Sequence, residues 1–158
     1  MSKIKTNAMR ILDSNKISYE ILSYTVKKDH IDGVEVANEI GRDVNEVFKT
    51  LVAQGNSKNI YVYVIPVHES LDLKKAAKVS GEKSIEMVHV KDINKYTGYI
   101  RGGCSPIGMK KSYTTFINDS ATSLKTIIVS AGKIGYQIEL SPLDLEKLIN
   151  CEFKDLIK

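Results

Sequence analysis

The 158-residue sequence has few residues of the kinds that build disulfide-bonded or metal-bound folds. Its two cysteines, Cys104 and Cys151, lie far apart and outside any C-x-x-C pattern. The sequence therefore indicates neither a disulfide framework nor a zinc site. The three histidines, His30, His68 and His89, are equally scattered. We do not expect a fold held together by disulfides or by zinc.

Long apolar segments are also missing. The first six residues contain no apolar core of a signal peptide, and no run approaches the roughly 18 apolar residues of a membrane span. No internal repeat, low-complexity tract or linker is found. The chain length is near the commonest domain size, and 42% of the residues are hydrophobic. We therefore expect one soluble, cytoplasmic domain over residues 1–158 that has no membrane partner.

A strong excess of charge of either sign is absent as well. The chain has 23 lysines and arginines against 19 acidic residues, which leaves a net charge of +4 at pH 7. This excess permits a polyanionic partner such as RNA without demanding one. No RNP1 pattern of an RNA-recognition motif occurs. The lysine pairs at 27–28, 74–75 and 110–111 are typical of solvated surfaces, and they gain interest only beside the glycine-rich segment described below.

Helical and strand patterns follow one another without a regular βαβ order. Apolar spacing predicts short helices over about residues 4–15, 36–40, 73–80 and 91–96, and a last helix that begins at Pro142 after the capping residue Ser141. Apolar and β-branched runs predict strands over 18–24, 48–53, 59–67, 113–118, 126–130 and 137–140. This mixture favours an α+β domain with a mixed, strongly curved sheet or partial barrel surrounded by short helices.

What the chain does have is a glycine-rich segment at residues 98–111, GYIRGGCSPIGMKK, with four of the ten glycines. Glycine permits positive φ and close backbone approach, and Pro106 fixes one φ. Residues 102–108 are therefore predicted to form a shaped loop that offers backbone N–H and C=O groups to a ligand. A structural turn between two strands is the alternative, and local chemistry favours neither.

Two familiar catalytic motifs do not fit this segment. Gly103 and Gly108 have the Walker A spacing, but Met109 stands where that motif needs lysine, so a P-loop is rejected. Ser105 lies in no G-x-S-x-G elbow. The residue inventory permits a Ser/His/Asp hydrolase, but no motif pairs a serine with a histidine, and this class is disfavoured.

Lys49 is the one charge inside the predicted strand at 48–53, whose apolar residues occupy both faces. Burying an unpaired ammonium is costly, so such a lysine lines a cavity, lies at a strand edge or meets an anion. We favour the cavity. Thr50 would point to the opposite face of a regular strand, where strand propensity alone explains it. Packing and hairpin chemistry likewise explain Tyr24 and the small-residue turn at 130–132.

Four separated motifs occur in the order found in one known family. They are FKTLV from Phe48, LDLKKAAK from Leu71, TGY from Thr97 with GGCSPIG from Gly102, and VSAGK from Val129. This set spans nearly the whole chain and resembles the YbaK/EbsC family of bacterial Cys-tRNA(Pro) deacylases.

The resemblance implies the fold of the prolyl-tRNA synthetase-associated editing domain and a free-standing enzyme that removes cysteine mischarged onto proline tRNA. Prolyl-tRNA synthetase is the implied partner, and no metal or cofactor is implied. Cysteine is close in size to proline, so the synthetase cannot reject it by size alone. In the mechanism proposed for the family, the substrate's own thiol attacks the ester carbonyl and forms a cyclic thiolactone. Such a reaction needs a shaped pocket rather than a catalytic triad.

The resemblance also implies roles for individual residues. Lys49 matches the family's essential lysine and is expected to orient the terminal adenosine or the ester, with Thr50 beside it as the second catalytic residue. The residues implied in substrate binding are Tyr24, Gly102, Gly103, Ser105, Pro106, Gly108, Ser130 and Gly132.

Four departures from the family pattern change these expectations. Asp32, beside Ile31, stands where the family usually has an aromatic wall residue. Ile134 replaces a common arginine, which weakens the expected tRNA contact, and Arg101 at a usually apolar position could compensate. Cys104 replaces an aliphatic residue. A packing role for it is favoured over a nucleophile, because no adjacent histidine or helix start would activate the thiol.

Other functions remain open at this point. Editing of another mischarged tRNA, such as Ala-tRNA(Pro), would depend on a water molecule positioned by the protein, and a substrate without a thiol would reveal it. A non-catalytic domain would bind tRNA or a synthetase without turnover. A nucleotide-binding module that uses the glycine loop is weakened by the missing Walker lysine.

Overall fold

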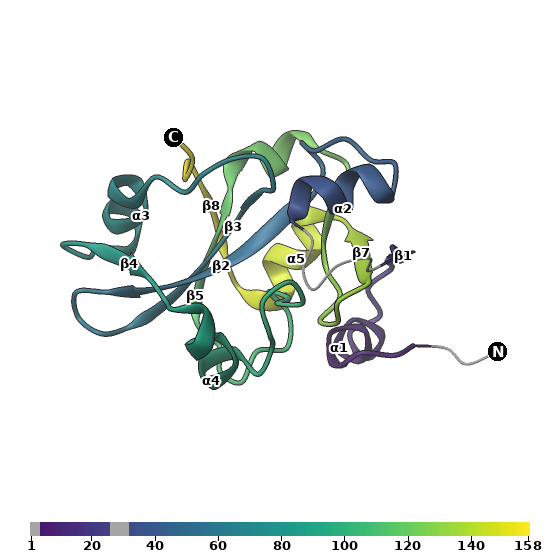
Figure 1. Cartoon of the computed structure of the whole chain (residues 1–158), viewed down its shortest axis with the longest axis horizontal. Helices are drawn as coiled ribbons and strands as arrows, with labels where there is room; N and C mark the ends of the chain where they lie inside the picture. Colours follow the sequence, from purple (N-terminus) through teal and green to yellow (C-terminus); the bar gives the residue numbers. More distant parts are fainter. Residues whose placement is uncertain (1–3, 26–31) are drawn as a thin grey trace.

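Two β-sheets and five α-helices make up the part of the chain that the structure, a computed structural model, describes: residues 4–25 and 32–158 (Figure 1). The first predicted strand, over 18–24, lies inside the first of these ranges. The first lysine pair, His30 and Ile31 lie outside the described residues.

The larger sheet has five strands in the order β4-β2-β3-β5-β8. These are β2 (Phe48–Gly55), β3 (Ile60–Pro66), β4 (Ile85–Met87), β5 (Thr114–Asn118) and β8 (Glu152–Lys154). β2 pairs antiparallel with β3 and β4, whereas the pairs β3–β5 and β5–β8 are parallel. The sheet is therefore mixed, as predicted, and β2 is an interior strand, as its apolar residues on both faces indicate.

The smaller sheet is antiparallel in the order β1-β7-β6. Its strands are β1 (Glu20–Ser23), β6 (Ile127–Ser130) and β7 (Tyr136–Leu140). A parallel bridge between Val47 and Ile128 joins it to the larger sheet, and the Ile128 N–H donates to the Glu46 carbonyl at 2.9 Å. The strands thus form two sheets that meet where β2 begins.

The five predicted helices are present, although α1 begins three residues after its predicted start and α2 three residues before it. They are α1 (Asn7–Ser14), α2 (Gly33–Glu39), α3 (Leu73–Ser80), α4 (Ile93–Thr97) and α5 (Pro142–Ile149), with 3-10 turns at Val90–Asp92 and Asp119–Ser123. Asp72 caps α3 by accepting from two backbone N–H groups, and Ser141 caps α5 by accepting from one. Gly81 ends α3 in the left-handed conformation. None of the helices in the described ranges is long and apolar enough to span a bilayer.

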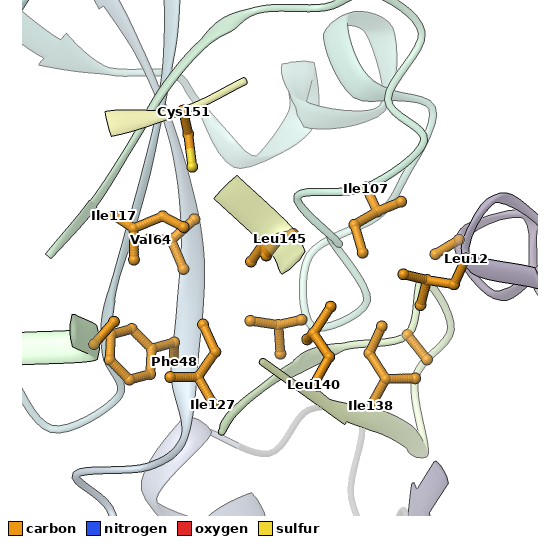
Figure 2. Close-up of a cluster of buried hydrophobic side chains, with 14 of the residues drawn as sticks. Leu12, Phe48, Val64, Ile107, Ile117, Ile127, Ile138, Leu140, Leu145 and Cys151 are labelled. Atoms are coloured by element: carbon orange, nitrogen blue, oxygen red, sulfur yellow. The ribbon is translucent and has the colours of Figure 1, made fainter. Parts of the chain in front are cut away.

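The main core lies between the larger sheet, the smaller sheet, α1 and α5. Figure 2 shows Leu145 of α5 at its centre, between Val64 of β3 and Ile107 of the glycine-rich segment, and all three side chains are fully buried. Truncating such a leucine to alanine costs about 2–5 kcal/mol. A second core, under α3, covers the other face of the larger sheet and contains Tyr63 and Phe116 with stacked rings. Both faces of β2 and β3 are thus packed against hydrophobic cores.

Candidate active site at the junction of the two sheets

A cavity of about 120 Å³ lies where the two sheets meet. Its wall comes from the start of β2, the end of β6, β7, the start of α2 and the glycine loop at residues 102–108. Five of the residues predicted for the site line it: Tyr24, Lys49, Thr50, Gly102 and Ser130. Pockets for drug-sized ligands are several times larger, so this cavity fits a small group such as one aminoacyl unit rather than a whole nucleotide.

The Lys49 side chain is half-buried in this cavity. Burial lowers the pKa of its ammonium, and the nearby charges of Asp32 and Glu69 oppose that shift with smaller effects. Among the described residues, none accepts a hydrogen bond from this ammonium or forms an ion pair with it. The cavity therefore holds a cation with free hydrogen-bonding capacity, and the prediction that Lys49 lines a cavity is confirmed.

Thr50 places a second polar group in the same wall. In the β2–β3 register Lys49 lies opposite Ile65 and Thr50 lies opposite Val64, so successive side chains alternate between the sheet faces as predicted. Both residues nevertheless contribute atoms to the cavity. The Thr50 Oγ1 atom is buried and has no hydrogen-bond partner in the described part of the chain. A buried hydroxyl without a partner costs about 1–3 kcal/mol, which a bound ligand would recover.

The glycine loop has a defined shape. Gly102 and Gly108 adopt φ of +86° and +80°, in the left-handed region that favours glycine. The Tyr99 hydroxyl donates to the Ile107 carbonyl, and the Ser105 hydroxyl accepts from the Ile107 N–H at 3.2 Å. The loop connects α4 to β5. The alternative of a turn between two strands is therefore wrong.

The loop packs against the turn at residues 131–135. A Cβ on Gly103 would lie 3.1 Å from the Ile134 backbone nitrogen, and one on Gly132 would lie 2.9 Å from the Tyr99 ring. The Ser130 hydroxyl accepts from the Gly132 N–H at 3.1 Å. Gly103 and Gly132 thus permit the close approach that brings Gly102 and Ser130 to the cavity, and neither lines it.

The remaining predicted loop residues lie away from the small cavity. Ser105 is fully buried within the loop. Pro106 and Gly108 instead line a second cavity of about 770 Å³ between α1, β5 and the end of α5. This second cavity is the larger of the two, but its one lysine, Lys111, is exposed to solvent. The half-buried cation and the unpartnered hydroxyl mark the smaller cavity as the candidate active site.

The structure explains two of the four departures from the family pattern, Asp32 and Cys104. Asp32 is exposed and caps α2, because its carboxylate accepts from the Glu35 N–H at 2.9 Å. Cys104 lines the small cavity, and burial raises the pKa of its thiol to about 11. A thiol with that pKa is almost wholly protonated near pH 7, which agrees with a packing role rather than with a nucleophile. Within the described ranges, no cluster of three or more His, Cys, Asp or Glu side chains is placed to hold a metal ion.

Several lining residues were not predicted. Gln137 is buried at the cavity although it alternates with the apolar residues of β7, a pattern that predicts an exposed position. Gly33 lines the cavity where a Cβ would lie 2.5 Å from a Val67 methyl carbon. No sequence signal separates these residues from ordinary strand and helix positions.

Comparison with known proteins places the chain in a family. It belongs to the aminoacyl-tRNA editing domain family, whose model matches residues 30–148. Members of this family act on aminoacylated tRNA. The chain is also 47% identical to a protein of Enterococcus faecalis provisionally named Cys-tRNA(Pro)/Cys-tRNA(Cys) deacylase EbsC, over 96% of this chain and 93% of the relative.

Solved structures show the same fold. A crystal structure described as a proposed trans-editing enzyme for prolyl tRNA synthetase has a TM-score of 0.83 and 18% identity, and it covers 98% of this chain and 99% of its own. A hypothetical protein has a TM-score of 0.85 and 20% identity, with 94% of this chain and 97% of its own covered. The prediction of an α+β editing domain is confirmed.

Proposed function

We propose that this protein is a trans-editing aminoacyl-tRNA deacylase that removes cysteine mischarged onto proline tRNA, in the cytoplasm and in company with prolyl-tRNA synthetase. The observation that carries the proposal is the small cavity, which brings Lys49, Thr50, Gly102, Ser130 and Tyr24 together. The family membership and the name of the Enterococcus faecalis relative support it. The whole chain, residues 1–158, acts as one editing domain.

The size of the cavity suits the task. A synthetase that selects proline by size admits cysteine, so a second hydrolytic site must inspect the product. A cavity of about 120 Å³ admits the aminoacyl end of the tRNA and leaves the rest of the nucleic acid outside. Recognition of the amino acid is thereby separated from recognition of the tRNA.

Positioning of the substrate's own thiol explains catalysis without a triad. The cysteine sulfur forms a bond to its own ester carbonyl carbon, the ester C–O bond breaks, and the thiol proton passes to the ribose oxygen. The tRNA leaves with a free hydroxyl and the cysteine leaves as a four-membered thiolactone, which water opens to free cysteine. The protein's contribution is to hold sulfur and carbonyl in contact.

Five of the residues that line the cavity have roles in that step. The Lys49 ammonium orients the ester end and stabilises negative charge that develops on oxygen. The Thr50 hydroxyl donates to the substrate and so gains the partner that it lacks. Backbone groups of the loop at Gly102 hold the aminoacyl amine and carbonyl, with Tyr24 and Ser130 as the opposing wall.

The test is a comparison of purified Cys-tRNA(Pro), Ser-tRNA(Pro) and Ala-tRNA(Pro) as substrates. Serine differs from cysteine by oxygen in place of sulfur, and we expect its release to be at least about 100-fold slower, because the intramolecular attack is lost. Turnover of the serine and alanine esters at the rate of the cysteine ester would show water-based editing and overturn the thiol mechanism. Binding of tRNA without turnover of any ester would overturn the enzyme itself.

A fourth substrate, Cys-tRNA(Cys), tests where tRNA identity is read. Equal turnover of both cysteinyl esters would show that the domain reads the amino acid and leaves tRNA selection to its partner. A strong preference for proline tRNA would show that the domain reads the tRNA as well.

A further inference from the structure

The chain's net positive charge is concentrated in one segment. Residues 90–118, from the 3-10 turn before α4 to the end of β5, hold five lysines and arginines against the single acid Asp92, which gives this segment a charge of +4. The rest of the chain holds 18 basic and 18 acidic residues. The segment contains α4 and the glycine loop, so the charge is carried by the part of the chain that helps to wall the candidate active site.

Two cations of this segment, Lys95 and Lys110, lie close to each other. The Lys110 side chain packs along Gly98 at the end of α4, and a Cβ on Gly98 would lie 3.3 Å from the Lys110 Cγ. The Lys110 ammonium donates to the Lys95 carbonyl at 3.4 Å. Arg101 directly precedes Gly102, which lines the cavity. Lys133, from the opposing turn, directly precedes Ile134, whose backbone contacts Gly103.

These side chains are free to bind an external anion. Six of them are exposed and make no ion pair with any described residue, and together they are named the basic surface: Lys91, Lys95, Arg101, Lys110, Lys111 and Lys133. Elsewhere in the described chain Arg42 and Lys75 are paired with carboxylates, whereas Lys74, Lys78 and Lys83 are exposed and unpaired but lie in and after α3, outside the cavity wall. Figure 1 shows α4 at an edge of the molecule, away from the packed centre.

We propose that the basic surface binds the phosphate backbone of the tRNA acceptor arm and directs its aminoacylated end past Gly102 into the cavity. This inference rests on the proposed function. Unpaired exposed cations bind nucleic acid largely through release of the counterions on the phosphates. A surface of this kind is indifferent to sequence, which suits a domain whose cavity reads the amino acid. Arg101 and Lys133 flank the loop and turn at the cavity, so they would contact the nucleotides nearest the ester.

The test removes three charges that lie outside the cavity wall. The variant Lys95→Gln/Lys110→Gln/Lys111→Gln is compared with Lys74→Gln/Lys78→Gln/Lys83→Gln. This matched set lies in and after α3, and its side chains are exposed and make no ion pair with any described residue. Two substrates are used: Cys-tRNA(Pro), and the cysteinyl ester of adenosine, which has no phosphate backbone.

For the first variant we expect KM for Cys-tRNA(Pro) to rise at least about tenfold with kcat little changed. The slope of log KM against log salt concentration should become shallower by about two to three, roughly one for each lost phosphate contact. Turnover of the adenosine ester should remain at the wild-type rate, since the cavity is unaltered. The α3 variant should behave as wild type with both substrates.

Three outcomes would overturn the proposal. The first is an unchanged KM and salt slope for Cys-tRNA(Pro) in the Lys95/Lys110/Lys111 variant. The second is an equal rise in KM in this variant and in the α3 variant. The third is a loss of adenosine-ester turnover that parallels the loss with tRNA. Binding of uncharged tRNA is measured in the same set of variants. If the wild-type protein cleaved neither ester, the proposed function would fail, and the tRNA-binding ratio of the two variants would still decide whether the basic surface exists.

Discussion

The two cavities of this protein differ in size and in chemistry. Size alone would favour the larger cavity as the active site, whereas the chemistry of the lining residues favours the smaller one. The cavity of about 770 Å³ is lined by exposed polar residues such as Ser112, by buried apolar residues such as Ile107 and Phe116, and by the end of α5. The cavity of about 120 Å³ holds the half-buried Lys49 and the unpartnered hydroxyl of Thr50. Keeping such groups unpaired lowers stability, so their presence indicates a function, whereas volume by itself does not.

One loop contributes to both cavities. Gly102 and Cys104 line the small cavity, and Pro106 with Gly108 lines the large one. Internal hydrogen bonds of Tyr99 and Ser105 fix the loop between them. Paired substitutions, one in each cavity, therefore separate the chemistry of the site from the general stability of the fold.

The largest effect is expected for Lys49→Met, compared with Ser112→Ala in the large cavity. Deacylation of Cys-tRNA(Pro) should fall by about 100-fold in Lys49→Met, because a charge that stabilises the transition state is lost. Ser112→Ala should stay within about twofold of the wild-type rate, since the exposed Ser112 lines only the large cavity. Similar losses in the two variants, measured by single-turnover kinetics, would remove the distinction between the cavities.

Lys49→Met is expected to lower activity but not stability. Burial lowers the pKa of Lys49, so between that lowered value and 10.5 the unfolded chain binds a proton that the folded protein has released. The contribution of Lys49 to stability therefore rises with pH across this window, and below it the buried charge is destabilising. We expect urea unfolding at pH 7 to show Lys49→Met at least as stable as wild type, with the difference shrinking as the pH approaches 10.5.

The next effect compares two threonines. Thr50→Val removes the unpartnered hydroxyl, so it should raise the free energy of unfolding by about 1 kcal/mol and slow deacylation about tenfold. Thr115 lines the large cavity, and its hydroxyl donates to the Tyr113 carbonyl at 2.9 Å. Thr115→Val should therefore lower the free energy of unfolding by about 1 kcal/mol and leave deacylation unchanged. A stability change of the same sign in both would contradict the assignment.

A smaller effect is expected for alanine substitutions at two glycines that both have positive φ. Gly132 and Gly81 have φ of +95° and +70°, so alanine strains either position by about 1 kcal/mol. A Cβ at Gly132 also meets the Tyr99 ring at 2.9 Å, whereas one at Gly81 meets nothing within 4 Å. Gly132→Ala should thus melt at a lower temperature than Gly81→Ala, and it alone should slow deacylation. Equal rates would show that the loop and the turn do not position the site.

The smallest effect is expected at the thiols, one in each cavity. Burial raises the pKa of Cys104 to about 11 and that of Cys151 to about 12. At pH 7.5 both are protonated, so iodoacetamide should label each far more slowly than a free cysteine, with rates that rise toward pH 11. Mass spectrometry measures the labelling. Rapid labelling of Cys104 at pH 7.5 with parallel loss of activity would instead support the nucleophile that its burial argues against.

Local signals in the sequence were sufficient for most elements of the fold. Asp72, Ser141 and Gly81 act at helix ends as predicted, because capping depends on residues within one turn. The strands at 48–53 and 59–67 are confirmed by β2 and β3. Two strands were not predicted, β4 and β8, since three residues each are too few to show a period and their pairing with distant strands alone makes them strands.

The sequence by itself also identified several of the residues that line the site. A lysine within an apolar strand and a glycine-rich segment with a proline are visible without coordinates, because both are locally unfavourable or unusual choices. The family motifs added Thr50, Tyr24 and Ser130, and the structure brings these residues to one cavity with Lys49 and Gly102.

Only the tertiary structure decided which of the predicted residues meet. Gly103 and Gly132 let the loop and the turn approach, Ser105 is enclosed, and Pro106 with Gly108 faces the other cavity. Burial of Gln137 runs against its strand alternation for the same reason. A cavity is made by segments far apart in the chain, here β2, β6, β7, α2 and the glycine loop, and no local pattern records how closely such segments pack.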